Sequence, residues 1–394
     1  MWLSSSRGCV FGDSDSQTPA FGRDRFPGVH LYFHVPFCAR RCSYCDFAIA
    51  VRRHVPSDVY VRAVLREWEQ CRAHESWGGS EVVDTVYFGG GTPSRLDPAG
   101  ISAIMRRIAA DRRISPSAEV TLETNPDDVT PGRAEAWTAA GVNRVSLGAQ
   151  SFDPTVLAWM HRTHGARQTM EAVEVLRNAG IGELSLDLIF GLPASLGRSW
   201  RADLDLALAV EPEHLSLYGL TVEEHTPLGR WAARGEVVPV DEDRYAAEFL
   251  EADAVLGAAG YEHYEVSNYA RPGRRARHNG AYWRRAAFIG LGPSAHSGWG
   301  RHRRWNLREW TAYERALAAG DSPVAGSERL DDEALDLEEL YLGLRTRDGV
   351  AAERVPPGSV AAWLSSGWAS ASQGRIRLSA EGWLRLDALA AMVA

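Results

Sequence analysis

The sequence predicts an α/β protein, a partial (β/α)6 barrel followed by a smaller mixed or helical C-terminal domain. Six short apolar runs alternate with helical patterns between residues 29 and 218, and repeated strand–helix units form parallel sheets with helices outside. Six units suit an open or partial barrel better than a closed eight-stranded one. The alternation fades after Tyr218, which sets the remaining chain apart.

Each predicted barrel strand is a short apolar run bounded by turn residues. The strands are Val29–His34, Val82–Phe88, Glu119–Glu123, Arg144–Leu147, Leu184–Phe190 and His214–Tyr218. The helices predicted between them are Ser57–His74, Pro98–Ala110, Pro131–Ala140, Arg167–Ala179 and Ser199–Ala209. Ser57 is expected to cap the first helix, and Gly180 to end the fourth.

The chain divides into four predicted parts. They are a loosely ordered N-terminal extension (1–27), the barrel (28–240), an extension close to the ligand site (241–306) and the C-terminal domain (307–394). Beyond the barrel, helices are predicted at Asp241–Ala259 and Ala380–Met392, and strands at Tyr261–Val266 and Ile376–Leu378. The Gly-, Arg- and aromatic-rich segment Pro272–Trp305 is predicted to be irregular. The C-terminal pattern suggests a winged-helix-like domain.

Composition narrows the class of protein. The chain has 394 residues, 45% hydrophobic and 24% charged, as in a globular protein, and its net charge of −8 gives no reason to expect a nucleic-acid partner. All 43 basic residues are arginine, which excludes a lysine Schiff base and a G-K-[ST] phosphate loop. Met1–Phe26 does not resemble a signal peptide, and no run of 18 apolar residues predicts a membrane span. A cytoplasmic protein is expected.

Three of the five cysteines lie in one loop directly after the first predicted strand. Cys38, Cys42 and Cys45 have the spacing C-x3-C-x2-C, whereas structural zinc normally takes four ligands in two separated pairs. Three thiolates suit a [4Fe–4S] cubane with one iron left free to bind a further ligand. That iron could chelate the amine and carboxylate of S-adenosylmethionine, and the protein would supply ligands and positioning.

The cysteine segment resembles the signature of the radical-SAM superfamily, including the aromatic Tyr44 directly before the third cysteine. The resemblance implies a partial (β/α)6 barrel, in agreement with the strand count. The run Gly89–Ser94 follows the second strand, and its glycines would let the backbone approach a ligand closely. Alone such a run is usually a tight turn; in the superfamily it holds the amino end of S-adenosylmethionine.

Polar residues follow or end further strands of the predicted sheet. They are Glu123, Gln150, Arg162 and Asp187. Any one of them alone is more often a cap or a solvated charge. The carboxyl ends of parallel strands meet at one edge of the sheet, so these four side chains would surround one opening. A ribose, adenine or carboxylate group bound there would need polar partners.

These segments resemble the anaerobic coproporphyrinogen-III oxidase family, and within it the HemW-type haem chaperones, from about Val29 to the C-terminus. The resemblance implies S-adenosylmethionine contacts at Tyr32, Gly90, Gly91, Thr92, Glu123, Gln150, Arg162 and Asp187. Gln150, Arg162 and Asp187 match residues that contact a second S-adenosylmethionine in the oxidases. Whether this chain also binds a second S-adenosylmethionine stays open.

Two features favour the chaperone branch over the oxidases. The oxidases carry a further cysteine two residues after the third ligand, where this chain has Phe47. The chain also contains the H-N-x-x-Y-W motif of the haem chaperones, and the expected haem contacts are His278, Asn279, Tyr282 and Trp283. A neutral imidazole can ligate haem iron, and flat aromatic rings can pack on a porphyrin. A structural turn is the plainer interpretation of the motif, and His34, His164 and His296 are lesser candidates for haem contact.

Two functions therefore remain open. In the first, favoured, the protein takes up haem and passes it to acceptor haemoproteins, such as respiratory enzymes at the inner membrane face. Contact with the membrane would then be peripheral. In the second, it is an oxygen-independent coproporphyrinogen III oxidase that converts propionate side chains to vinyl groups. RNA modification is disfavoured because no aromatic–basic stacking module is evident, and no catalytic residue is assigned.

Overall fold

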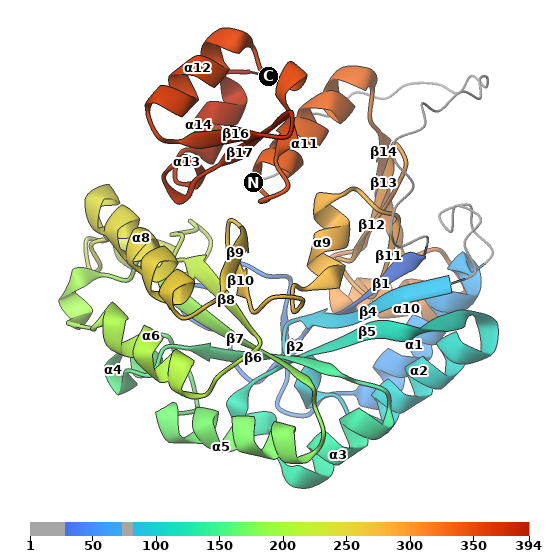
Figure 1. Cartoon of the computed structure of the whole chain (residues 1–394). Coiled ribbons are helices and arrows are strands. Elements are labelled where there is room, and N and C mark those ends of the chain that lie inside the picture. The colour runs from blue at the N-terminus through green and yellow to red at the C-terminus, as the bar shows by residue number, and fades with distance from the viewer. Residues whose placement is uncertain (1–27, 73–81, 394) are drawn as a thin grey trace.

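The computed structural model describes residues 28–72 and 82–393. The predicted N-terminal extension, with Cys9, and the predicted end of the first helix at His74 lie outside these residues. A twelve-stranded sheet dominates the molecule, and helices cover its outer face (Figure 1). Among the described residues, no helix combines the length and apolar character that a membrane crossing requires.

Six neighbouring strands of the sheet run parallel, which confirms the predicted partial (β/α)6 barrel. They are β1 (Val29–Val35), β4 (Val82–Gly90), β5 (Arg113–Thr124), β6 (Arg144–Gln150), β7 (Glu183–Phe190) and β8 (His214–Gly219). The helices between them are α1 (Ser57–Cys71), α2 (Pro98–Asp111), α3 (Pro131–Ala139), α5 (Ala166–Asn178) and α6 (Trp200–Ala209). Two short helices, α4 (Pro154–Trp159) and α7 (Pro227–Ala233), were not predicted.

The first helix does not begin as predicted. Pro56 occupies the cap position of α1, and Ser57 is the first helical residue. The Ser57 hydroxyl instead accepts a hydrogen bond from the backbone N–H of Asp97, 3.0 Å away. Ser57 therefore joins α1 to the start of α2, and the Ser57 cap prediction was wrong.

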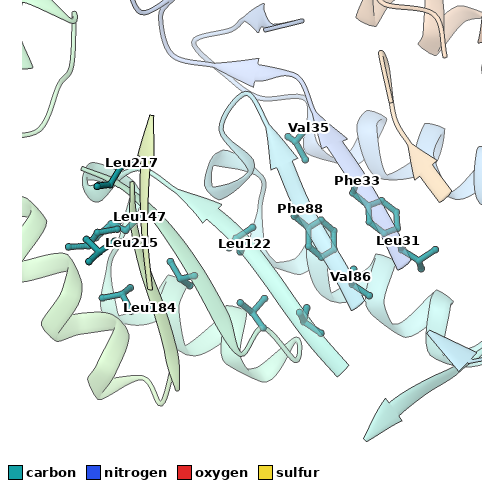
Figure 2. Close-up of a cluster of buried hydrophobic side chains, with 14 of the residues drawn as sticks. Leu31, Phe33, Val35, Val86, Phe88, Leu122, Leu147, Leu184, Leu215 and Leu217 are labelled. Atoms are coloured by element: carbon teal, nitrogen blue, oxygen red, sulfur yellow. The ribbon is translucent and has the colours of Figure 1, made fainter. Parts of the chain in front are cut away.

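The barrel strands have an apolar outer face and a polar inner face. Outward side chains such as Leu31, Phe33 and Phe88 are buried against the helices in one core (Figure 2). Successive side chains of a strand point to opposite faces, so His30, Tyr32, His34 and their neighbours point inward. Three of the polar side chains in the lumen lie within hydrogen-bond distance of one another. The His30 imidazole lies 2.9 Å from the Thr85 hydroxyl, and that hydroxyl lies 2.6 Å from the His278 imidazole. The lumen of this barrel is therefore lined by polar side chains that form hydrogen bonds with one another.

Further strands extend the sheet at both edges, all of them in antiparallel pairs except the one beside β1, which pairs with β1 in parallel. Beside β8 lie β10 (Asn268–Ala270) and β9 (Glu262–Glu265), which follow helix α8 (Glu242–Ala258). Beside β1 lie β11 (Phe288–Leu291), β12 (His296–Trp299), β13 (His302–Asn306) and β14 (Val324–Arg329), here named the β11–β14 extension. The prediction that Pro272–Trp305 is irregular was wrong: it holds helix α9 (Arg277–Trp283) and the strands β11–β13, because β11 pairs in parallel with the distant β1.

The C-terminal residues form a small unit above the sheet (Figure 1). Helix α10 (Trp310–Ala319) packs back on α1, and the unit follows with α11 (Asp332–Leu344), β15 (Val350–Ala351), α12 (Pro357–Ser365), β16 (Ala369–Ser372) and β17 (Arg375–Leu378). The three strands form one antiparallel sheet in the order β15-β17-β16, packed with these helices, so the predicted mixed C-terminal domain is present. The predicted final helix is divided into α13 (Ala380–Trp383) and α14 (Leu386–Ala391).

Candidate cofactor site

A cavity of about 740 Å³ lies at the carboxyl ends of the parallel strands. Its walls are the cysteine loop, the glycine turn after β4 and the segments that follow β5 to β8. Parallel sheets gather ligands at this edge because their loops converge there. Ten of the eleven residues predicted from the sequence as cluster ligands or S-adenosylmethionine contacts line it: Cys38, Cys42, Cys45, Gly90, Gly91, Thr92, Glu123, Gln150, Arg162 and Asp187.

The cysteine loop is closed at its base by a short pair of parallel strands. Residues of β2 (Phe37–Cys38) pair with β3 (Ala50–Val51), and the Arg52 N–H donates to the Cys38 carbonyl at 2.9 Å. The Cys45 N–H donates to the Cys42 carbonyl at 3.4 Å, which forms a turn inside the loop. Cys38 at the end of β2, with Cys42 and Cys45 among the eleven residues between the two strands, can therefore present three thiols from one anchored loop.

The surroundings of the three sulfurs fit an iron–sulfur cluster. All three cysteines are free and partly exposed in the cavity. The Thr92 hydroxyl donates to Cys38 Sγ at 3.4 Å, and an Arg162 guanidinium nitrogen donates to Cys42 Sγ at 3.7 Å. Donors of this kind stabilise thiolate ligands and tune the potential of a cluster.

Burial raises the pKa of the Cys38 thiol to about 11, and burial also raises the pKa of Cys45. A cationic cluster iron would favour the thiolate and offset that burial. Within the described residues, no three His, Cys, Asp or Glu side chains converge on one point as ligands of a single ion would.

The glycine turn lets β4 pass directly under the cysteine loop. Gly90 has a φ of +112°, and a Cβ there would lie 2.7 Å from the His34 ring. A Cβ on Gly91 would lie 2.8 Å from the Pro36 backbone and 3.0 Å from Cys38 Sγ. Close packing against the cysteine loop therefore explains these two glycines even before any ligand is considered.

Gly91→Ala is expected to displace the cysteine loop, because the new methyl group would meet backbone atoms that cannot move without the loop. Iron and sulfide content after anaerobic reconstitution should fall well below that of the wild-type protein. Gly132→Ala in α3 is the matched control, since a Cβ there meets nothing within 4 Å. Wild-type cluster content in Gly91→Ala would contradict the described packing.

Glu123 is held at the cavity wall by two donors. Its carboxylate accepts from the Tyr87 hydroxyl at 2.8 Å and from the Gly90 N–H at 3.0 Å. Burial raises the pKa of Glu123 to about 7, and the nearby charge of Asp187 raises it further against those hydrogen bonds. The carboxyl group can therefore carry or release a proton near neutral pH.

Glu123→Gln is expected to change how stability depends on pH. The folded protein keeps a proton on Glu123 between pH 4.5 and about 7, where the unfolded chain has lost it, so the free energy of unfolding falls as pH rises through this window. Because the amide of Gln does not titrate, the free energy of unfolding of Glu123→Gln should decrease less than that of the wild type across this window, by about 2 kcal/mol. Urea unfolding of cluster-free protein at both ends of the window measures the difference. The exposed Glu135→Gln should follow the wild type, and identical slopes for Glu123→Gln and wild type would refute the assignment.

Three more predicted contacts lie on the opposite wall of the cavity. Arg162 bridges two loops through Asn125 Oδ1 at 2.7 Å and the Gly148 carbonyl at 2.9 Å. Asp187 accepts from the Ser146 hydroxyl at 2.9 Å, and burial raises the pKa of Asp187 to about 6. Gln150 has a φ of +65°, a strained conformation for a residue with a side chain, of the kind that functional sites retain.

Tyr32 is the predicted contact that does not line the cavity. It points into the barrel lumen, where its hydroxyl lies 3.1 Å from His34 Nδ1 and its ring stacks on Tyr87. Tyr87, which the sequence did not single out, joins this layer to the cavity through its hydrogen bond to Glu123. Its inward position on β4, two residues before Gly89, was the available signal.

The H-N-x-x-Y-W motif lies one layer below the cavity, on α9 inside the barrel. His278 is buried, stacks on Tyr87 with ring centroids 4.9 Å apart, and its Nε2 lies 2.7 Å from the Tyr282 hydroxyl. Its Nδ1 is engaged by Thr85. Burial lowers the pKa of His278 well below its ordinary value, so the ring is neutral, but haem ligation would have to break one of these two hydrogen bonds.

The other residues of the motif also make contacts within the protein. Asn279 and Trp283 are partly exposed, and the Arg345 guanidinium lies 4.5 Å from the Trp283 ring. The backbone N–H groups of Arg277 and His278 donate to Glu119 at 2.9 Å each. Arginines that flank the motif, which could otherwise pair with haem propionates, pair with carboxylates of the chain: Arg274 with Glu183, Arg275 with Glu262, and Arg285 with Glu338.

The lesser haem candidates differ in accessibility. His34 and His164 are buried, and their Nε2 atoms lie 2.9 and 3.1 Å from the carbonyls of Ala48 and Ala149. His296 is exposed on β12. Phe47, at the position where the oxidases have a cysteine, is 67% exposed and lines the mouth of the cavity.

Three thiols on one loop at the mouth of an open parallel barrel define a radical-SAM protein, and residues 32–207 match the family model of the Radical SAM superfamily. The heme chaperone HemW of Mycobacterium tuberculosis is 37% identical over 91% of this chain and 93% of its own length. HemW of Escherichia coli is 37% identical over 69% of this chain and 70% of its own. The chain belongs to the HemW family.

One solved structure shows the same fold. Coproporphyrinogen III oxidase (HemN) from Escherichia coli has a TM-score of 0.77 with this chain at 20% identity, and the match covers 93% of this chain and 90% of that one. Membership of the superfamily implies a [4Fe–4S] cluster and S-adenosylmethionine, for which the residues of the cavity are suited.

Proposed function

We propose that this protein is a haem chaperone, which binds haem and delivers it to acceptor haemoproteins. The observation that carries the proposal is the 37% identity with the Mycobacterium tuberculosis heme chaperone along nearly the whole of both chains. Phe47 at the cavity mouth supports it over the oxidase function, since the oxidases carry a cysteine at this position, two residues after the third cluster thiol. We place the protein in the cytoplasm, with respiratory enzymes among its acceptors.

Cys38, Cys42 and Cys45 would hold the cluster, and the rest of the cavity would hold S-adenosylmethionine. When bound, the cluster supplies an electron to reductive chemistry of S-adenosylmethionine. Thr92 and Arg162 stabilise two of the thiolates through the hydrogen bonds described above. Gly90 and Gly91 bring backbone polar groups close to the ligand, and Tyr32 supports this wall from below.

Glu123, Gln150 and Asp187 would offer polar partners to the ribose, adenine and carboxylate groups. Glu123 and Asp187 can each hold a proton near neutral pH, because burial raises the pKa of both carboxyl groups. A protonated carboxyl donates a hydrogen bond as well as accepting one. The cavity can therefore satisfy a hydroxyl-rich ligand without collecting two negative charges.

The test is a haem titration on anaerobically reconstituted protein, followed by a coproporphyrinogen assay on the same sample. We expect a haem absorbance spectrum that saturates with added haem, transfer of that haem to an apo-haemoprotein, and no protoporphyrinogen. Cys38→Ala is the control that removes a cluster ligand, so it separates haem uptake from cluster chemistry. Protein with an intact cluster that takes up no haem would overturn the proposal, and turnover of coproporphyrinogen would establish the oxidase instead.

A further inference from the structure

The histidines of the described chain fall into a buried group and an accessible group. The buried imidazoles each have at least one ring nitrogen in a hydrogen bond inside the protein, and they are His30, His34, His164, His214, His263 and His278. A haem iron would have to break such a bond and enter the core. The accessible imidazoles are the exposed His54, His161, His225 and His296 and the partly exposed His302. An accessible haem ligand is to be sought among these.

His296 lies on the inner face of the β11–β14 extension. It stands opposite Trp305 of β13, with ring centroids 6.0 Å apart and planes inclined by 30°. Among residues 28–72 and 82–393 its ring has no hydrogen-bond partner. Partial loss of water around the ring and the charge of Arg303 lower the pKa of His296. The imidazole is therefore neutral at neutral pH, and a nitrogen lone pair is available to a metal.

The sheet around His296 is flat and aromatic. The Phe288 ring lies over Gly298, where a Cβ would come within 2.7 Å of it, and the Trp305 ring lies over Gly326, where the distance would be 2.5 Å. These glycines let both rings lie down on the strands. A flat aromatic floor beside an imidazole is a surface to which the face of a porphyrin is complementary.

The same surface borders the cysteine loop. His34 lies between the two: its Nε2 lies 2.9 Å from the Ala48 carbonyl of the loop, and its backbone packs against Gly292, which follows β11. The exposed Arg308 donates to the Asp46 carbonyl at 3.4 Å, which places a guanidinium at the junction. Arg308 can pair with an anionic propionate, and Phe47, 67% exposed, follows Asp46 in the loop.

We propose that His296 is the axial ligand of haem iron, with the porphyrin lying on Trp305 beside the cysteine loop and a propionate on Arg308. This inference rests on the proposed function and gives it a location. It also separates the haem site from the H-N-x-x-Y-W motif, whose imidazole instead holds α9 inside the barrel.

His161 is the competing accessible histidine. It lines the cofactor cavity, and its ring packs edge-on against Trp231 with centroids 5.7 Å apart. A cavity of about 740 Å³ has the size of a site for one drug-sized ligand. We assign this cavity to the cluster and S-adenosylmethionine, and a haem titration of His161→Ala tests that assignment against His296.

The test compares haem titrations of wild type, His296→Ala, His161→Ala and His302→Ala, all as full-length reconstituted protein. His302 is the matched control: it is on the neighbouring strand, stacked on Trp299, and its register places it on the opposite face from His296. We expect His296→Ala to weaken haem binding about tenfold or more and to lose the absorbance and paramagnetic signature of histidine ligation. His161→Ala and His302→Ala should keep both.

Rescue separates loss of the ligand from loss of structure. Free imidazole added to His296→Gly should restore the ligation signature, because it can occupy the vacated position, and cluster content should match wild type throughout. Wild-type haem binding in His296→Ala would overturn the inference and leave the proposed function intact. A wild-type protein that takes up no haem would overturn the proposed function itself, and loss of the signature only in His161→Ala would move the ligand to the cavity.

Discussion

Replacing Arg198 with leucine should lower the free energy of unfolding by about 3–5 kcal/mol. The buried guanidinium donates to Glu248 at 2.6 Å, to Asp203 at 3.3 Å and to the Ile189 carbonyl at 3.1 Å. Leucine would leave the buried Asp203 carboxylate without its cation and would leave Glu248 with Arg244 alone, 3.1 Å away. Urea unfolding at neutral pH measures the change.

The loss should also reach the cofactor cavity. Asp203 accepts from the Phe152 N–H at 2.8 Å, and Glu248 accepts from the Gly191 N–H at 2.8 Å. Through these two carboxylates Arg198 fixes the loops after β6 and β7, which lead from cavity residues Gln150 and Ile189.

The matched control is Arg201→Leu in the first turn of α6, three residues after Arg198. Its ion pair with Asp205 at 2.8 Å is exposed, so we expect a change below about 0.5 kcal/mol. Equal effects of the two substitutions would show that the buried pairing contributes nothing beyond a surface pair.

Glu67→Leu should cost about 3 kcal/mol, since it removes the acceptor of three buried donors, each worth about 1 kcal/mol or more when unpaired. The carboxylate accepts from the Gly292 N–H at 2.8 Å, from Asn306 Nδ2 at 2.5 Å and from the Tyr313 hydroxyl at 2.5 Å. Glu67 thereby ties α1 to the β11–β14 extension and to α10. The free energy of unfolding in urea is the measurement.

Two further variants sharpen this result. Glu67→Gln keeps an acceptor oxygen and should lose less stability than Glu67→Leu. Glu69→Leu, two residues on, removes only an exposed pair with Arg107 at 3.2 Å and should stay within about 0.5 kcal/mol of wild type. If Glu67→Leu were as stable as Glu69→Leu, the described anchor of the extension would be wrong.

The barrel could be predicted because its signals are local. Each parallel strand is buried on its outer face by a helix that follows it in sequence, so apolar runs and helical patterns alternate in order. The cavity residues could be predicted for the same reason, since each lies near the carboxyl end of a recognisable strand. The cavity residues come together because all parallel strands end at the same edge of the sheet, so no sequence signal between distant residues is needed to predict it.

The β11–β14 extension could not be predicted because its signals are not local. Strand β11 has four residues and takes its pairing from β1, some 250 residues earlier in the chain. Strands β12 and β13 mix Gly, Arg, His and Trp, whose packing on a sheet depends on the neighbours they meet. Propensity alone therefore suggests an irregular segment.

The position of the H-N-x-x-Y-W motif shows a second limit. The sequence offers an imidazole and two aromatic rings, but it does not say that Thr85 and Tyr282 engage the His278 ring from both sides. Thr85 is 193 residues away in the chain. Only the folded arrangement distinguishes a buried, hydrogen-bonded histidine from an accessible one such as His296.

The account depends on three thiols of one loop holding an iron–sulfur cluster at the mouth of the barrel. The most direct measurement is the iron and sulfide content of anaerobically reconstituted protein, with its visible absorbance and the paramagnetic signal of the reduced form, compared with the Cys38→Ala/Cys42→Ala/Cys45→Ala variant and with Cys71→Ala. The account predicts a [4Fe–4S] signature in wild type and in Cys71→Ala, whose thiol is buried away from the loop, and none in the triple variant. A cluster that survives in the triple variant, or none in wild type, would contradict it.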